Sequence, residues 1–136
     1  MKSTLFIVKS ILQILILPIV IFTSSIQASS NLDVSGDGKA DILWRNQVTG
    51  KNWLWTMDGV KVSESKGLNT IPLYWEIVGR GDFDGDGKSD IFWRNNNGGR
   101  NYIYLMDGFT TRVSEELNYL PNFDWKVKGV TDLNGD

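Results

Sequence analysis

The sequence contains no cysteine and no histidine. Without cysteine the chain can form no disulfide, and without either residue it can hold no metal through thiolate or imidazole ligands. Catalysis by a Ser-His-Asp or Cys-His arrangement is excluded for the same reason. Any stabilisation of this chain beyond ordinary packing must therefore come from other groups.

Positive charge is also scarce. The chain has 14 lysines and arginines against 16 aspartates and glutamates, for a net charge of −2. Proteins that bind nucleic acids neutralise phosphates with clustered lysine and arginine, and the sequence contains no such cluster. We therefore expect no nucleic acid among the partners.

Residues 1–28 are typical of a secretory signal peptide. Lys2 and Lys9 come first, an apolar run follows, and small and polar residues lead up to Ala28 as the last residue before cleavage. An uncleaved membrane anchor is the alternative, but Gln13 interrupts the run, which falls short of the roughly 20 apolar residues of a membrane span. We expect a secreted, periplasmic or cell-surface protein with no membrane contact once the leader is removed.

The sequence after the leader repeats itself. The matched segments are 41–46 with 90–95, 53–59 with 102–108, and 75–79 with 125–129. The first two pairs are 49 residues apart and the third pair 50, so one extra residue has entered after Gly108. So many matches in the same order indicate a tandem array.

Each repeat is rich in strand-forming residues and turn signals. The first repeat contains four such runs, at residues 41–46, 51–57, 60–66 and 75–80. The Asp58-Gly59 pair is a hairpin signal. Four strands in about 50 residues is the period of a propeller blade. The predicted fold is all-β, with tandem four-stranded blades of an incomplete β-propeller: about two blades and the start of a third.

A loop rich in carboxylates precedes one strand of each repeat. In the second repeat it places Asp82, Asp84, Asp86 and Asp90 at positions 1, 3, 5 and 9, with the backbone carbonyl of Lys88 at position 7. Hard oxygen ligands at alternating positions, with glycines that allow a tight turn, suit Ca²⁺. A solvated acidic turn is the alternative, because aspartate and glycine also favour turns. The recurrence of the spacing favours calcium.

The first copy of this loop has one carboxylate fewer. It places Asp33, Ser35, Asp37, Lys39 and Asp41 at the same five positions, so serine replaces the second aspartate. Fewer charged ligands lower calcium affinity, and we expect this site to be the weaker one. A third copy begins at the end of the sequence, with candidate ligands Asp132, Asn134 and Asp136.

The phrase GDFDGDGKSDI, which begins at Gly81, and the period of the repeat resemble the FG-GAP/VCBS repeats of bacterial secreted proteins, which are related to integrin alpha-subunit blades. The resemblance implies a propeller, usually of about seven blades, with calcium in loops between strands. It makes residues 29–136 a partial propeller domain with blades at about 33–81 and 82–131 and a truncated third from 132. It also carries the ligand roles onto the matching aspartates of both loops, with Ser35 in doubt.

The tryptophans admit two interpretations. Trp44 and Trp93 occupy equivalent positions, as do Trp75 and Trp125, which is expected of aromatic packing between blades. Aromatic-lined surfaces also bind sugars, and that remains the alternative.

Two further motifs carry less weight. Arg80-Gly81-Asp82 is an RGD tripeptide, but Asp82 is the first candidate calcium ligand. The glutamates that could form a glycosidase-type acid/base pair lie beside a packing tryptophan or in polar edge-like segments, so we expect no enzymatic activity. These glutamates are Glu64, Glu76, Glu115 and Glu116.

The function predicted from the sequence is that of a secreted calcium-binding repeat module for adhesion or recognition, with calcium in a structural role. The alternative is a noncatalytic accessory or carbohydrate-binding module of a larger secreted enzyme. The expected partner is an extracellular protein or carbohydrate. Because two blades and part of a third cannot close a ring, we expect either a fragment of a longer protein or self-association.

Overall fold

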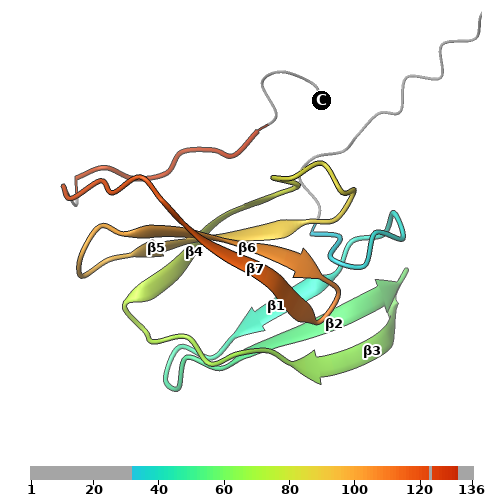
Figure 1. The fold of residues 1–136 in the computed structure, drawn as a ribbon. Helices are drawn as coiled ribbons and strands as arrows, with labels where there is room; N and C mark the ends of the chain where they lie inside the picture. The colour runs from blue at the N-terminus through green and yellow to red at the C-terminus, as the bar shows by residue number, and fades with distance from the viewer. Residues whose placement is uncertain (1–31, 123, 132–136) are drawn as a thin grey trace, which may run out of the picture.

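The computed structural model describes residues 32–122 and 124–131, and these residues form an all-β fold (Figure 1). Two antiparallel sheets, one of three strands and one of four, lie against each other, consistent with incomplete blades of a β-propeller. The strands are β1 (Ile42–Arg45), β2 (Asn52–Asp58), β3 (Lys61–Gly67), β4 (Trp75–Gly81), β5 (Asp90–Asn95), β6 (Asn101–Asp107) and β7 (Thr110–Leu117). The part of the chain that the structure describes contains no helix long and apolar enough to cross a membrane. The predicted leader and the third carboxylate loop lie outside the described residues.

The two sheets contain the same hairpin. Gly59 and Gly108, which follow β2 and β6, have positive φ values of 61° and 57°, as the predicted Asp-Gly turns require. Each hairpin also has a bulge at the same place, so that Ser63 on β3 and Arg112 on β7 are the extra residues. The repeat in the sequence therefore corresponds to a repeat in structure down to the irregularities of the ladder.

The sheets are not in phase with the sequence repeat. The run that ends the first repeat forms β4, and β4 pairs with β5 in the second sheet rather than with β1, β2 or β3. The first sheet thus extends over 42–67 and the second over 75–117, whereas the repeat divides the chain into 33–81 and 82–131. The reason is the connection over 68–74, which carries the chain from one sheet to the next before the last strand of the repeat forms.

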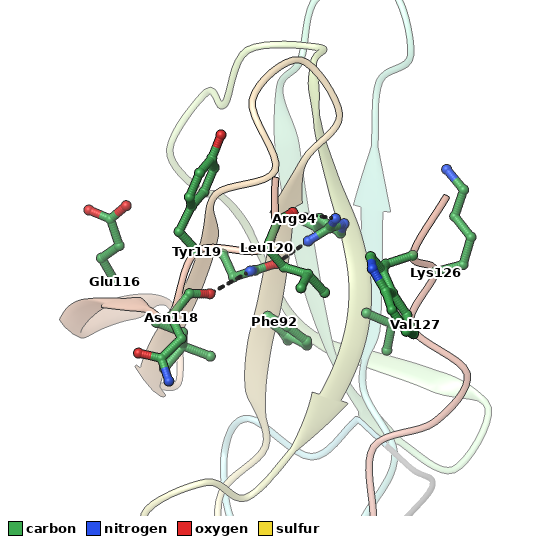
Figure 2. A pocket seen from close by; sticks show the side chains of 11 residues that line it. Phe92, Arg94, Glu116, Asn118, Tyr119, Leu120, Lys126 and Val127 are labelled. Carbon is green, nitrogen blue, oxygen red and sulfur yellow. Dashed lines mark hydrogen bonds between the residues drawn. The ribbon is translucent and has the colours of Figure 1, made fainter. Parts of the chain in front are cut away.

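An arginine holds the long loop that follows each sheet's last strand, and Figure 2 shows the buried one, Arg94. Arg94 donates to the side-chain oxygen of Asn101 at 2.8 Å and to the backbone carbonyl of Leu120 at 3.0 Å. Arg45 donates to Asn52 at 3.0 Å in the same way and also to carbonyls of its own loop. Charged donors satisfy several carbonyls that would otherwise lie unpaired beneath the loop. The arginine of the repeated phrase is therefore a structural residue.

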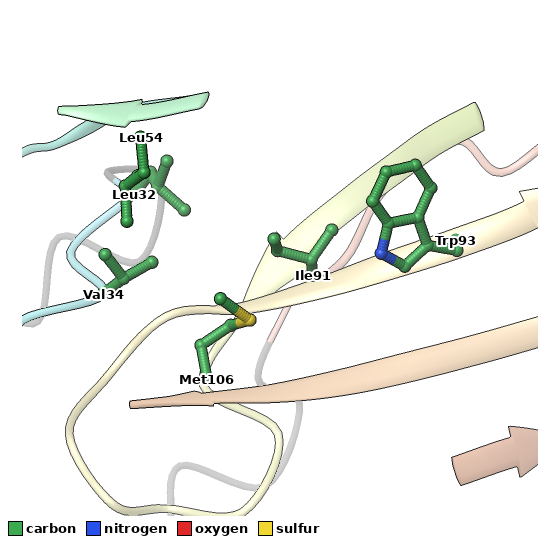
Figure 3. Packing of buried hydrophobic residues seen from close by; sticks show 6 residues of the cluster. All are labelled: Leu32, Val34, Leu54, Ile91, Trp93 and Met106. Atoms are coloured by element: carbon green, nitrogen blue, oxygen red, sulfur yellow. The ribbon is translucent and has the colours of Figure 1, made fainter. Parts of the chain in front are cut away.

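The core lies between the two sheets (Figure 3). Leu54 from β2 is 1% exposed and packs in one cluster with residues of β5 and β6. The cluster consists of Leu32, Val34, Leu54, Ile91, Trp93 and Met106. Trp93 is the only tryptophan of the described residues in this cluster, and its repeat equivalent Trp44 is 49% exposed. The expected packing of matched aromatics between blades therefore holds for Trp93 and not for Trp44, because nothing described covers the outer face of the first sheet.

Candidate metal centre

The carboxylate loop of the second repeat, residues 82–89, connects β4 to β5. Gly85 and Gly87 have φ values of 75° and 84°, which are readily reached only by glycine. These two glycines let the chain reverse twice within a few residues. The loop is compact for that reason, and its aspartates are brought together.

Asp82 is the residue around which the loop winds. One of its carboxylate oxygens accepts hydrogen bonds from the backbone N–H groups of Gly85 at 2.8 Å and Asp86 at 3.1 Å. The other oxygen accepts from the N–H of Gly87 at 2.8 Å. Because these bonds engage both oxygens, Asp82 is not displayed as part of a free RGD tripeptide.

Three aspartates of this loop form a cluster. Asp82, Asp84 and Asp86 are exposed, and each offers one carboxylate oxygen within 4.8 Å of the other two. Calcium–oxygen distances of 2.3–2.6 Å place ligands on opposite sides of the ion about 5 Å apart, so this spacing suits a calcium ion. The donor set is also appropriate, since all three ligands are hard carboxylate oxygens.

Two basic side chains already approach this cluster. Arg112, the bulge residue of β7, pairs with Asp84 and lies 3.4 Å from a carboxylate oxygen of Asp86. This pairing raises the pKa of Arg112, with the hydrogen bond to Asp84 as the largest cause. Lys88 reaches out of the loop to Asp107, with 2.7 Å between its Nζ and a carboxylate oxygen, and this hydrogen bond lowers the pKa of Asp107. The negative charge of the cluster is thus partly balanced within the protein.

Asp90, the fourth predicted carboxylate ligand, has a different environment. Its side chain is fully buried, and its oxygens accept hydrogen bonds from the N–H groups of Phe83 at 2.9 Å and Met106 at 2.8 Å. Burial raises the pKa of Asp90, and the two backbone hydrogen bonds oppose that rise. Asp90 lies outside the three-carboxylate cluster. In this structure it joins the start of the loop to β6.

The first loop has the same winding. The carboxylate of Asp33 accepts from the N–H groups of Gly36 at 2.7 Å and Gly38 at 2.8 Å. Asp41 repeats the bonds of Asp90, accepting from Val34 and Met57 at 3.0 Å each. Burial raises the pKa of Asp41 as well.

The first loop does not reproduce the cluster. Within the described residues, the only group of three acidic side chains close enough to hold a metal is the one in the second loop. Ser35, at the position of Asp84, donates its hydroxyl to Asp33 at 3.3 Å instead. The Nζ of Lys39 lies 3.5 Å from a carboxylate oxygen of Asp37 and 3.2 Å from one of Asp58. The second ion pair is equivalent to that between Lys88 and Asp107.

The two loops are in direct contact. The N–H of Ser89 donates to the backbone carbonyl of Asp33 at 2.6 Å, and the N–H of Asp33 donates in return to the hydroxyl oxygen of Ser89 at 2.9 Å. The N–H of Gly108 also donates to the carbonyl of Val34 at 2.8 Å. The candidate sites therefore belong to one continuous rim.

Sequence reasoning missed Arg112. It comes 22 residues after Asp90 and becomes a neighbour of the loop only through the β6–β7 hairpin and its bulge. A signal was nevertheless available, because Asp84 and Arg112 correspond to Ser35 and Ser63. Both members of the ion pair are replaced together in the first repeat.

Comparison with known proteins identifies one family. Residues 74–106 match the model of the FG-GAP repeat, and the match covers β4, the second carboxylate loop, β5 and nearly all of β6. No curated protein and no solved structure matches the chain. The predicted resemblance to FG-GAP repeats is thereby confirmed for residues 74–106.

Proposed function

We propose that this chain, which carries an FG-GAP repeat, is a secreted calcium-binding module for adhesion or recognition in which the ion has a structural role. The observation that carries the proposal is the cluster of Asp82, Asp84 and Asp86, whose oxygens lie within 4.8 Å of one another. The leader-like residues 1–28 support export to a compartment where calcium is available.

The hydrogen bonds and ion pairs of the loop's aspartates determine how much a bound ion can stabilise the loop. Asp82 is fixed by three backbone N–H groups, so it presents its remaining lone pairs in a defined direction. Asp84 and Asp86 are balanced by Arg112, which shares their oxygens with any bound cation. Because this guanidinium already offsets part of the repulsion, we expect the ion to add a modest increment of stability to a loop that is already formed. The spacing of the loop adds the Lys88 carbonyl and Asp90 to the proposed ligand set, and Asp90 would have to give up a backbone hydrogen bond to Phe83 or Met106 to reach the ion.

Catalysis is not part of this proposal. Two of the candidate glutamates are engaged or exposed at an edge: Glu116 accepts hydrogen bonds from Arg100 at 2.6 Å, and Glu64 is exposed on β3. Ion pairing with Arg100 lowers the pKa of Glu116 to about 2. A carboxylate with so low a pKa is a poor general acid near neutral pH.

A carbohydrate-binding or accessory role within a larger secreted enzyme is the second candidate. It is favoured by the outer face of the first sheet, where Trp44 and Trp53 are 49% and 48% exposed. Trp44 and Trp55 lie edge to face with their ring centroids 5.0 Å apart. Exposed rings of this kind stack on sugars, and the partner in this case is an extracellular glycan.

The calcium proposal is tested by thermal unfolding of the exported chain in EDTA and in millimolar calcium. A site with a dissociation constant of 10⁻⁴–10⁻³ M stabilises the fold by roughly 0.4–1.4 kcal/mol at about 1 mM calcium. For a domain of this size that corresponds to a rise in melting temperature of about 2–10 °C. We expect Asp84→Asn, which keeps a hydrogen-bond acceptor for Arg112, to lose most of this rise.

Glu64→Gln is the matched control, since it removes one exposed carboxylate from β3 outside the loops. It should keep the full calcium-dependent rise. An unchanged melting temperature of the parent chain on addition of calcium, in a chain that unfolds cooperatively, would refute the proposal and identify the loops as acidic turns.

A further inference from the structure

The outer face of the first sheet is exposed, whereas the equivalent face of the second sheet is covered. Ile91 and Trp93 are 2% and 3% exposed, because the first sheet packs on them. Their repeat equivalents Ile42 and Trp44 are 37% and 49% exposed. The first sheet therefore presents a face whose counterpart is buried by a neighbouring sheet elsewhere in the same molecule.

One face of the first sheet covers the second sheet. The equivalent face of the second sheet lies on its far side, away from the first sheet. Leu43 of the first sheet packs against the core, and its repeat equivalent is Phe92. Phe92 instead lines an open pocket of about 630 Å³, together with Leu120, Trp125 and Val127 (Figure 2). The Phe92 face and the Trp44 face are therefore the repeat equivalents of the two faces that pack together between the sheets.

Residues 125–130, which follow the second sheet, match the sequence of a strand but are not part of either sheet. Residues 125–130 repeat 75–80, which form most of β4, yet they make no ladder pairs within the described chain. Val130 lies against β4, where its methyl group occupies the space that a Cβ at Gly79 would need. The segment is placed beside the second sheet with its backbone pairing unused.

In the part of the chain that the structure describes, the first sheet has three strands and no partner on the free edge of β1. Among the described residues β1 pairs with β2 alone, whereas its equivalent β5 pairs with both β4 and β6. The described residues therefore include a strand-like segment outside any sheet and a sheet in which no fourth strand is described. Unpaired strand edges are templates for pairing with another chain.

We propose that residues 125–130 of one copy add to β1 of a second copy as its fourth strand, so that copies associate head to tail. The β4–β5 register fixes the pairing, because Ile77 lies opposite Trp93 and Arg80 opposite Ile91. Transferred through the repeat, Val127 of one copy faces Trp44 of the next. The Phe92 face of the first copy then covers the exposed Trp44 face of the second.

Such an assembly can close into a ring. The described residues of each copy contribute two sheets, and propellers close with about four to eight blades. Two, three or four copies, counted by these two sheets each, fall in this range. Head-to-tail contacts that close by rotation give rings of this kind.

One charge distinguishes the contact between copies from the contact within a copy. In the second sheet Glu76 lies opposite Arg94, an opposite-charge pair. In the proposed contact the corresponding residues are Lys126 and Arg45, which repel. The association should therefore be weak and depend on concentration.

This repulsion provides the test, by sedimentation of the exported full chain over a range of concentrations, in calcium and in EDTA. We expect Lys126→Glu to lower the dissociation constant of each contact by about two- to fivefold. Lys128→Glu is the matched control, since it makes the same change at the position of Val78, which is the unpaired bulge residue of β4. Equal effects of the two variants, or a parent chain and Lys126→Glu variant that stay monomeric at every concentration, would overturn the proposal.

Cysteine cross-linking checks the register independently, because the chain has no cysteine of its own. Trp44→Cys and Val127→Cys chains, mixed under mild oxidation, should form a covalent heterodimer, since opposed residues of antiparallel strands lie within disulfide distance. Trp44→Cys mixed with Lys126→Cys, one residue out of register, should cross-link much more slowly. Equal rates of cross-linking would overturn the register. If residues 26–31 of the same chain pair with β1, the chain would stay monomeric and no heterodimer would form, which would overturn the proposal.

The proposal is independent of calcium binding. Association that persists in EDTA and in the Asp84→Asn variant supports it whatever the outcome of the melting experiment. A failure of calcium to raise the melting temperature affects only the proposed function.

Discussion

The two repeats of this chain have the same backbone plan and differ in the charges around the carboxylate loop. Both loops wind around their first aspartate, and both fasten their last aspartate to a neighbouring strand. Only the second loop has the additional Asp84, and only the second hairpin has Arg112 at its bulge. The comparison indicates that loop shape depends on Asp82 and Asp90 and their equivalents, while the three-carboxylate cluster depends on the added Asp84.

The strongest test of this comparison is removal of the buried aspartate that fastens each loop. Asp90→Ala leaves the N–H groups of Phe83 and Met106 without acceptors in a fully buried place. We expect a loss of about 3 kcal/mol in the free energy of unfolding, measured by urea denaturation. Asp41→Ala, whose carboxylate is 6% exposed, should cost less, about 2 kcal/mol.

An Asp90→Ala variant as stable as the parent would show that the shape of the loop does not depend on this fastening. Asp124→Ala serves as the control, because Asp124 is exposed and lies outside both loops. Its effect should stay within about 0.5 kcal/mol.

A smaller effect separates the loops by their affinity for calcium. Asp86→Ala removes a member of the three-carboxylate cluster, whereas Asp37→Ala removes its equivalent in a loop with fewer charges. We expect calorimetric titration of Asp86→Ala to lose the tighter binding step and that of Asp37→Ala to lose the weaker one. Loss of the tighter step in Asp37→Ala would reverse the order of the two sites and indicate that Arg112 competes strongly with the ion.

The smallest expected effect concerns an ion pair found in the second repeat alone. Arg100 and Glu116 correspond to Lys51 and Gly67, so the first repeat has no such pair. Because the pKa of Glu116 is lowered to about 2, its contribution is present above the ordinary glutamate pKa and is lost as the pH falls towards 2.

Glu116→Gln should therefore reduce the loss of stability between about pH 4.5 and pH 2, by a small amount because the pair is exposed. Melting temperatures of the parent and the variant across this range measure the difference. Parallel curves would mean that the pair contributes nothing in solution.

Much of the fold follows from local sequence signals. Asp58-Gly59 and Asp107-Gly108 predict the two hairpins because glycine is needed at a positive φ, and the strand runs between turns appear as β1 to β7. The partner of β4 could not be predicted in this way. Its pairing with β5 depends on where the connection over 68–74 carries the chain, and that is decided by packing between the sheets.

The candidate site was predictable in its loop and not in its surroundings. The spacing of Asp82, Asp84 and Asp86 predicts the cluster because alternate residues of a tight loop point to one centre. The same spacing gives Asp90 a ligand role, but it cannot reveal that Met106, on another strand, claims one of its oxygens. Burial differences between Trp44 and Trp93 were equally hidden, since the two residues have the same local sequence.

The last strand of the sequence repeat, β4, belongs to the next sheet, and this affects how a repeat can be duplicated within the chain. A duplicated segment that encodes residues 33–81 adds three strands of one sheet and, in β4, the first strand of the sheet after it. The inserted unit thus meets the existing chain through backbone pairing on both sides rather than through surface contact alone. Duplication of a unit whose boundary falls at the carboxylate loop therefore lengthens the array without creating a new unpaired edge.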